Sequence, residues 1–149
     1  MKIEYFTENQ EKFLSLLELA DEPRFIQKYL KECTILVASE NDDIRAVMAI
    51  TADEEDWIEI QNLAVLENVQ DQKIGSHLLG NFLDNLEHYG KKYQGILVRT
   101  DEYTAKFYEK NGFERFKRVE NYFPQKYGYP IYNKGRELKD NIYLRIKLK

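Results

Sequence analysis

The feature that most constrains the fold of this chain is a strand-like run followed at once by a short turn and a helix-like run. Residues 57–66 are rich in β-branched and apolar side chains, and the helix-like run continues to Tyr89. Gly75 lies in the turn between them, and Gly90 is expected to end the helix. The unpaired N–H groups and the dipole of a helix favour an anion at its first turn. The turn is therefore a candidate cradle for a phosphate or pyrophosphate group.

The remaining pattern alternates strands and helices in the order β-α-α-β-β-β-α-β-α-β-β. Strands are expected at residues 2–6, 34–39, 44–51, 57–66, 94–100, 113–121 and 141–148. Helices are expected after a capping box at residues 7–10, from Pro23, after the glycine turn and at residues 103–110. Residues 34–66 should form an antiparallel meander, residues 57–66 and 94–100 a parallel pair, and residues 122–138 a loop. The pattern by itself predicts a mixed α/β sheet.

Length and composition favour a single globular domain over residues 1–149, with 43% hydrophobic and 32% charged residues. No apolar run approaches the roughly 20 residues that span a bilayer, and the N-terminus lacks a signal-peptide pattern. The chain has one cysteine, Cys33, so no internal disulfide is expected. The cytoplasm is the expected compartment, and no membrane partner is expected.

Charge is unevenly distributed along the chain. Residues 1–71 contain 17 acidic and 6 basic residues, whereas residues 72–149 contain 9 acidic and 16 basic residues. The basic half suits an anionic cofactor and the acidic half a cationic co-substrate, although solvated surface charge is the alternative for any single residue. Without a long Lys/Arg cluster, nucleic acid is not expected as a partner. His77 and His88 lack metal-ligand spacing, so no metal site is expected.

A second motif follows the glycine turn by about thirty residues. Residues 107–113 read Phe-Tyr-Glu-Lys-Asn-Gly-Phe. The turn and this motif, in this order, resemble the GNAT superfamily of acyl-CoA-dependent N-acyltransferases. The resemblance implies an α/β (α+β) fold with a mixed, mostly antiparallel central sheet of about seven strands, flanked by about four helices. It also implies acetyl-CoA as co-substrate.

The phosphate motif of that superfamily is Q/R-x-x-G-x-G/A. Gln70 takes its first position and Gly75 its last, while Lys73 stands where the first glycine is usual. Lys73 adds a Cβ where the backbone approaches phosphate, but it also adds a cation. The resemblance implies that backbone N–H groups of the turn bind the pyrophosphate. These are the N–H groups of Gln70, Asp71, Gln72, Lys73, Ile74, Gly75 and Ser76. An ordinary helix start packed against a strand is the alternative.

The strand before the turn carries the residues that the resemblance places at the thioester. Backbone N–H groups of Leu63, Ala64 and Val65 are expected to bind the thioester carbonyl or the pantetheine arm, where they would stabilise an oxyanion. Glu59 resembles the general base of one branch of the superfamily, acting through water. By period two, Glu59, Gln61 and Leu63 should share one face of the strand. A solvated strand residue is the alternative for Glu59.

Tyr108 matches the superfamily tyrosine whose hydroxyl lies near the sulfur of coenzyme A. A phenol at this place can protonate the departing thiolate, and a packing role alone is the alternative. Asp101 stands seven residues earlier, where the superfamily often has an asparagine that contacts the cofactor. The same contact is the expected role of Asp101.

The expected function is transfer of an acetyl group from acetyl-CoA to a primary amine, by direct attack in a ternary complex. The acceptor is expected to be a small-molecule or peptide amine, and the acidic half favours a positively charged one. A homodimer is a further possibility. A non-catalytic acyl-CoA-binding sensor or accessory module is the alternative function, since Lys73 and Asp101 depart from the superfamily pattern.

Overall fold

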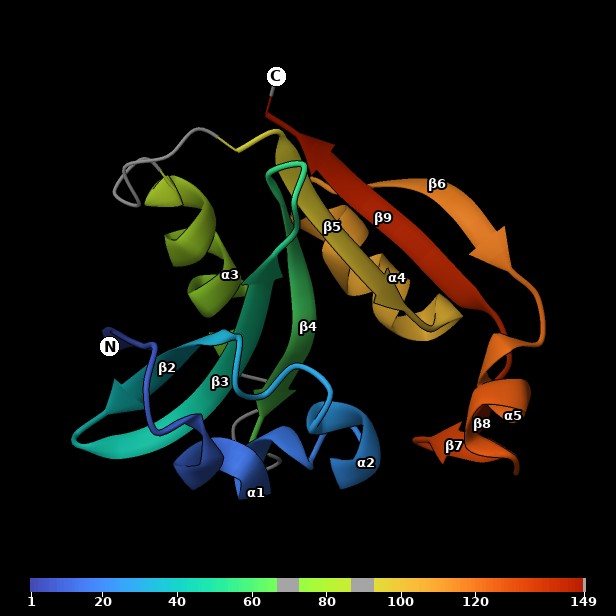
Figure 1. The fold of residues 1–149 in the computed structure, drawn as a ribbon, viewed down its shortest axis with the longest axis horizontal. Coiled ribbons are helices and arrows are strands. Elements are labelled where there is room, and N and C mark those ends of the chain that lie inside the picture. Colours follow the sequence, from blue (N-terminus) through green and yellow to red (C-terminus); the bar gives the residue numbers. More distant parts are fainter. Residues whose placement is uncertain (67–72, 87–92, 149) are drawn as a thin grey trace. The chain divides into compact units, whose positions relative to one another are not determined.

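The computed structural model describes residues 1–66, 73–86 and 93–148 (Figure 1). The chain divides into two compact units, Met1–Tyr93 and Gln94–Lys149. The single domain over residues 1–149 stays a prediction. No helix within the described residues has both the length and the apolar character needed to cross a membrane.

The first unit contains an antiparallel sheet of four strands and most of the chain's core. Its elements are β1 (Lys2–Phe6), the 3₁₀ helix η1 (Gln10–Phe13), α1 (Leu14–Leu17), α2 (Pro23–Ile26), β2 (Thr34–Glu40), β3 (Asp43–Ala52), β4 (Trp57–Val65) and α3 (Ile74–Asp84). The strands pair in the order β1-β2-β3-β4, each antiparallel to its neighbours. The predicted meander is therefore confirmed.

The turn between β2 and β3 follows from two residues that tolerate the left-handed backbone region. Asn41 has φ 52° and Asp42 has φ 67°, as a two-residue hairpin turn of type I′ requires. Asn and Asp enter this region more readily than other residues with a Cβ. The hairpin expected here from the sequence is confirmed.

Helices cover both faces of the first unit's sheet. One face, which carries Val47, Ala49 and Ala64, packs on a buried cluster from the N-terminal helices that includes Leu17 and Ile26. The other face, which carries Met48, packs on α3, a helix that contacts β2, β3 and β4 (Figure 1). The α3 side chains that face the sheet are fully or almost fully buried, namely Ile74, Leu78, Leu79 and Phe82.

The second unit contains a three-stranded sheet, two helices and a small hairpin. Its elements are β5 (Gly95–Thr100), α4 (Glu102–Lys110), β6 (Glu114–Val119), α5 (Tyr122–Tyr127), β7 (Ile131–Asn133), β8 (Arg136–Leu138) and β9 (Asn141–Lys147). β9 pairs antiparallel with both β5 and β6, so β5 and β6 run parallel to each other. The predicted fold class, with seven strands in a mixed main sheet and flanking helices, is confirmed. The parallel pairing of residues 57–66 with 94–100 stays a prediction.

Residues 122–138 are not a loop, and this part of the sequence prediction is wrong. They form α5 and the hairpin β7–β8. α5 is one short helix that ends at Gly128, whose φ of 82° closes it. Lys134, with φ 52°, and Gly135, with φ 79°, take the left-handed backbone angles that the two-residue turn of the hairpin needs. The aromatic residues of this segment obscured both patterns.

One predicted helix start also differs from the structure. The capping box at residues 7–10 is wrong, because the Gln10 amide donates to the carbonyls of Thr7 and Cys33 and caps no helix. The α3 helix ends at Asp84, and its last turn is closed by the Asn85 amide donating to the Asn81 carbonyl. The predicted end at Gly90 lies outside the described residues.

Candidate functional site

A β-bulge interrupts β4 at Gln61. Asn62 pairs with Ala49 and Ile60 pairs with Ile50, so two neighbours on β3 face residues that are two apart on β4. Gln61 is the extra residue, and its side-chain amide donates to the hydroxyl of Thr51 at 3.0 Å. A bulge of this kind bends the strand and changes which face its side chains occupy.

The bulge overturns the predicted arrangement of Glu59 and Leu63. Glu59 pairs with Thr51 and Leu63 pairs with Met48, and these two partners lie on opposite faces of β3. Glu59 and Leu63 therefore lie on opposite faces, not on one face as period two predicted. Glu59 shares the face of the N-terminal helices, and it is half-buried. The half-buried Leu63 and Val65 face α3, whereas Ala64 is buried in the helix-covered core.

Asn62 fastens the N-terminal helices to the same face of β4. It is buried, and its Nδ2 atom donates to the Leu17 carbonyl at 3.0 Å and to the Tyr29 hydroxyl at 3.1 Å. Burial raises the pKa of the Tyr29 phenol to about 12, so this hydroxyl stays protonated. Sequence reasoning missed this contact. An asparagine within an alternating strand could have indicated it, because a buried amide needs hydrogen-bond partners.

The start of α3 has the geometry of an anion site. The first helical hydrogen bond runs from the His77 N–H to the Lys73 carbonyl, so the N–H groups of Ile74, Gly75 and Ser76 precede the helical ladder. Lys73 is the N-cap and is exposed, and its φ of 59° is left-handed. Lys73 stands where the superfamily usually has a glycine, and its backbone lies in the left-handed region that glycine adopts most readily. The N-terminus of a helix favours a bound anion such as a phosphate group.

Of the turn residues predicted to hold the pyrophosphate, those from Lys73 to Ser76 are among the described residues. Gln70, Asp71 and Gln72 lie outside the described residues, as does His88. Ile74 and Gly75 are buried, and Ser76 is half-buried. The predicted contact of these residues with pyrophosphate stays a prediction.

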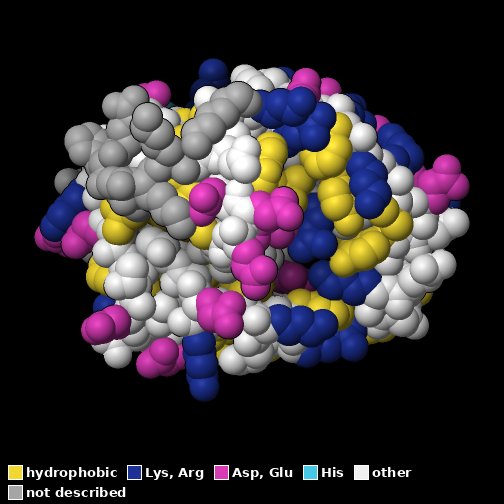
Figure 2. Space-filling model, turned by 45° about the horizontal axis from the view of Figure 1, so that its top comes forward, with side chains coloured by type: hydrophobic (Ala, Val, Ile, Leu, Met, Phe, Trp, Pro, Cys, Tyr) yellow, Lys and Arg dark blue, Asp and Glu magenta, His cyan; other side chains and the backbone are white. Residues whose placement is uncertain are grey.

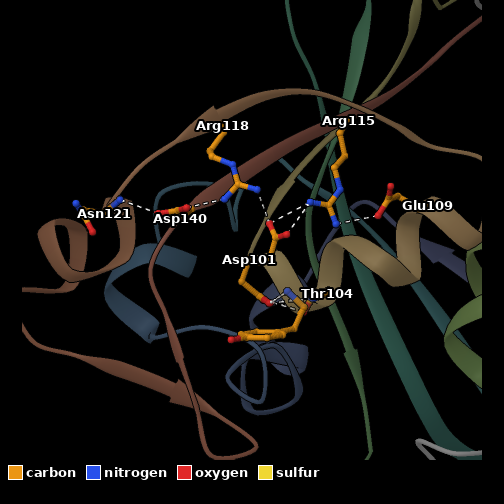
Figure 3. Close-up of polar contacts among 9 residues, drawn as sticks. Asp101, Thr104, Glu109, Arg115, Arg118, Asn121 and Asp140 are labelled. Atoms are coloured by element: carbon orange, nitrogen blue, oxygen red, sulfur yellow. Dashed lines mark hydrogen bonds and ion pairs between the residues drawn. The ribbon is translucent and has the colours of Figure 1, made fainter.

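Asp101 is the N-cap of α4, whereas the resemblance to the superfamily implied a contact with the cofactor. Its Oδ1 atom accepts from the Tyr103 and Thr104 N–H groups at 2.9 and 2.8 Å, and its Oδ2 atom accepts from the Thr104 hydroxyl at 2.7 Å (Figure 3). The residue is 7% exposed. Both carboxylate oxygens are engaged with the first turn of α4, which leaves little capacity for a direct cofactor contact.

Tyr108 lies on the buried side of α4, seven residues after its cap. It is 4% exposed and its ring stands edge-on to Phe113, with ring centres 5.4 Å apart. Burial, and then the negative charge of Asp101, raise the pKa of the Tyr108 phenol above its usual value. A phenol of ordinary pKa is already protonated at neutral pH, and the upward shift of Tyr108 leaves it so.

An ion-pair network fastens α4 to β6. Arg115 bridges Glu102 and Glu109, at the two ends of α4, with nitrogen–oxygen distances of 2.9 Å (Figure 3). Arg118 contacts Glu102 at 2.8 Å and Asp140 at 2.6 Å. Hydrogen bonding from Arg115 holds the pKa of the Glu102 carboxyl below its usual value. The network fixes the helix that carries Tyr108, and no spacing rule in the sequence pointed to it.

The sequence matches one family model and several known proteins. Residues 31–115 match the model of the acetyltransferase (GNAT) domain. Over 150 residues the chain is 23% identical to YvbK of Bacillus subtilis (strain 168), an uncharacterized N-acetyltransferase, covering 99% of this chain and 97% of that protein.

Two solved structures share the whole fold. An IAA acetyltransferase from Bacillus cereus ATCC 14579 is 30% identical with a TM-score of 0.86, and 99% of each chain is covered. A GNAT family acetyltransferase from Elizabethkingia anophelis, with acetyl-CoA bound, is 28% identical with a TM-score of 0.85. That match covers 99% of this chain and 97% of the other.

Proposed function

Because the chain belongs to the GNAT acetyltransferase family, we propose that it transfers the acetyl group of acetyl-CoA to a primary amine by direct attack in a ternary complex. The bound acetyl-CoA of the Elizabethkingia anophelis relative supports acetyl-CoA as the co-substrate. The names of the relatives favour an enzyme over the non-catalytic sensor or accessory module. The acceptor is a small-molecule or peptide amine, and the expected compartment is the cytoplasm.

The first turn of α3 is the proposed pyrophosphate site. The N–H groups of Ile74, Gly75 and Ser76 precede the first helical hydrogen bond, and the left-handed Lys73 opens the helix. Gln70, Asp71 and Gln72 complete this site in the proposal. Lys73 adds a positive charge beside the phosphate, which a glycine does not supply.

The proposed reaction forms one carbon–nitrogen bond and breaks one carbon–sulfur bond. Glu59, or a water that it orders, takes a proton from the amine. A backbone N–H among Leu63, Ala64 and Val65 donates to the oxyanion that forms on the carbonyl oxygen. Tyr108 gives its proton to the departing thiolate. Most of the rate gain comes from positioning and charge stabilisation.

The observation that carries this mechanism is the place of Tyr108, at the position of the superfamily tyrosine and on the buried side of α4. A phenol of ordinary pKa has its proton at neutral pH, and burial and then the Asp101 charge raise the pKa of Tyr108 further. Asp101 enters the proposal mainly as the cap that holds α4, because both of its oxygens already accept hydrogen bonds within that helix.

The test is release of thiol from acetyl-CoA across a panel of primary amines, with each acetylated amine identified by mass. We expect release that saturates with both substrates and equals the acetylated amine formed. Glu59→Gln should lower turnover and reduce its rise with pH. Binding of acetyl-CoA without amine-dependent release would favour the sensor instead.

A further inference from the structure

The β-bulge of β4 brings two polar side chains, Glu59 and Asn62, to one face of the first unit's sheet. They are three residues apart, and in a regular strand an odd separation puts side chains on opposite faces. Because Gln61 is the extra residue, both side chains instead lie on the face of the N-terminal helices. Their partners on β3, Thr51 and Ala49, are two positions apart, which is about 7 Å along a strand. One water molecule can bridge polar side chains at that separation.

One atom of Asn62 has a buried hydrogen-bonding capacity that the described residues do not use. The Nδ2 atom donates to the Leu17 carbonyl and to the Tyr29 hydroxyl, which uses both amide protons. The Oδ1 atom is buried and accepts no hydrogen bond from the residues that the structure describes. Figure 2 shows charged side chains at the surface, where they bond to bulk water, but Asn62 is 6% exposed. A buried acceptor without a donor is costly, so native proteins rarely keep one.

The Tyr29 hydroxyl offers a proton at the same place. It accepts from the Asn62 Nδ2 atom at 3.1 Å, so the further bond that it can make is as a donor. Burial, with a smaller contribution from the negative charge of Asp21, raises the pKa of this phenol. An unused acceptor therefore lies beside a donor. A buried water satisfies such a pair, because it makes about three hydrogen bonds to polar groups that lack other partners.

We propose that Asn62 positions the water through which Glu59 takes the proton of the acceptor amine. The water accepts from the Tyr29 hydroxyl and donates to Asn62 Oδ1 and to the Glu59 carboxylate. The bound amine donates to the same water, whose oxygen takes the amine proton as one of its own protons passes to Glu59. Asn62 is thus a positioning residue that acts through the water. This inference rests on the proposed function and names the group that holds the water beside Glu59.

The direction of the Asn62 Oδ1 atom is fixed before any substrate binds. Two hydrogen bonds hold the Asn62 amide. Gln61 holds the bulge, because its amide donates to the hydroxyl of Thr51 at 3.0 Å, and Thr51 is the strand partner of Glu59. A water bound here meets partners that are already in place, so the protein does not reorganise at the moment of reaction.

A crystal structure of the wild-type protein, at a resolution that shows ordered water, tests the arrangement without any acceptor. We expect one water within about 3.2 Å of Asn62 Oδ1, the Tyr29 hydroxyl and a Glu59 carboxylate oxygen. The same water should be lost in Asn62→Leu, which keeps the size of the side chain and removes both polar atoms. A wild-type structure without this water, or with a water that reaches Asn62 but not Glu59, overturns the inference.

A double-mutant cycle tests the role of Asn62 in proton transfer, with the best acceptor of the amine panel. In the wild-type background, Asn62→Leu should lower kcat about 10- to 100-fold, within the contribution of a general base. In the Glu59→Gln background it should cost less than about threefold, because residues that act as a unit are not additive. An equal loss in both backgrounds would show an independent, structural effect and overturns the inference.

Gln10→Leu is the matched control for lost stability. Gln10 is also buried, and its amide also donates to backbone carbonyls of the N-terminal segment, those of Thr7 and Cys33. The substitution should lower the midpoint of thermal unfolding, as Asn62→Leu does, but leave kcat unchanged. A fall in kcat as large as that of Asn62→Leu would assign both losses to stability and overturns the inference.

Tyr29→Phe tests the same water if Asn62→Leu does not fold. It keeps Asn62 Oδ1 and removes one donor to the water, so we expect a smaller fall in kcat that is absent in the Glu59→Gln background. No fall, or an equal fall in both backgrounds, overturns the inference. If the wild type acetylates no amine, the proposed function fails, and the crystal structure still decides whether Asn62 and Glu59 share a water.

Discussion

Asp101 caps the α4 helix that carries Tyr108, and its negative charge adds to the effect of burial on the Tyr108 phenol. The two Asp101 oxygens accept three hydrogen bonds from the first turn, and the pKa of Tyr108 is raised by burial first and by Asp101 second. One carboxylate therefore both orders the helix and raises the pKa of the Tyr108 phenol.

Tyr108→Phe tests the phenol as a general acid. The substitution keeps the ring that packs on Phe113 and removes only the hydroxyl. We expect turnover to fall roughly 10²- to 10⁴-fold with little change in acetyl-CoA affinity, measured by steady-state kinetics and by calorimetry. Tyr103→Phe, at an exposed position of the same helix, is the control. Unchanged turnover, in single-turnover conditions that exclude product release, would leave Tyr108 with a packing role only.

Asp101→Ala should destabilise the chain through the loss of the helix cap. The expected cost in the free energy of unfolding is about 1–2 kcal/mol, because two N–H groups lose their acceptor. Asp101→Asn keeps one oxygen in place and should lose less. Thermal or denaturant unfolding of the three proteins measures the order, and equal stability of Asp101→Ala and wild type would contradict the capping role.

Lys73→Gly should stabilise the chain and retain acetyl-CoA binding. A residue with a Cβ at φ 59° is strained, and glycine removes that strain at some cost in unfolded-chain entropy. The expected net gain is roughly 0.5–1 kcal/mol in denaturant unfolding. Lys73→Ala removes the charge but not the strain and should show no such gain. Lys73→Glu should bind acetyl-CoA more weakly, and equal affinity would remove this turn from the pyrophosphate site.

The Glu102 ion pairs should make a small, pH-dependent contribution to stability. Glu102 has a lowered pKa, so its contribution is present above the ordinary carboxyl value of 4.5 and is lost as the pH falls through the lowered pKa. The difference in unfolding free energy between wild type and Glu102→Gln should be at most about 1 kcal/mol, because the pairs are exposed and solvent screens them. Salt should reduce it, and the exposed Glu120→Gln is the control. A difference that grows toward low pH would contradict this assignment.

Sequence reasoning succeeded where local chemistry decides the structure. The hairpin at Asn41 and Asp42 was predictable because these residues accept left-handed backbone angles. Pro23 begins α2 as expected, since its fixed φ suits the first helical position. Gly112 follows α4 with φ 95°, as a helix C-terminus favours.

The misses share a different cause, which is that tertiary partners compete for the same groups. Gln10 cannot be read as a capping residue from sequence, because its acceptors include Cys33, which lies 23 residues later. The bulge at Gln61 depends on how β3 and β4 align, and strict alternation cannot contain an extra residue. Asp101 resembled a cofactor contact, yet the nearest unsatisfied N–H groups were those of its own helix.

The most direct test of the proposed acetyl transfer is a mass measurement on protein and product after incubation with acetyl-CoA. Without an amine, the intact protein should keep its unmodified mass, because direct attack forms no acetyl-enzyme. With a primary amine that the protein acetylates, one acetylated amine should appear for each coenzyme A released. A protein that gains one acetyl group before the amine is added, and loses it afterwards, would contradict direct transfer in a ternary complex.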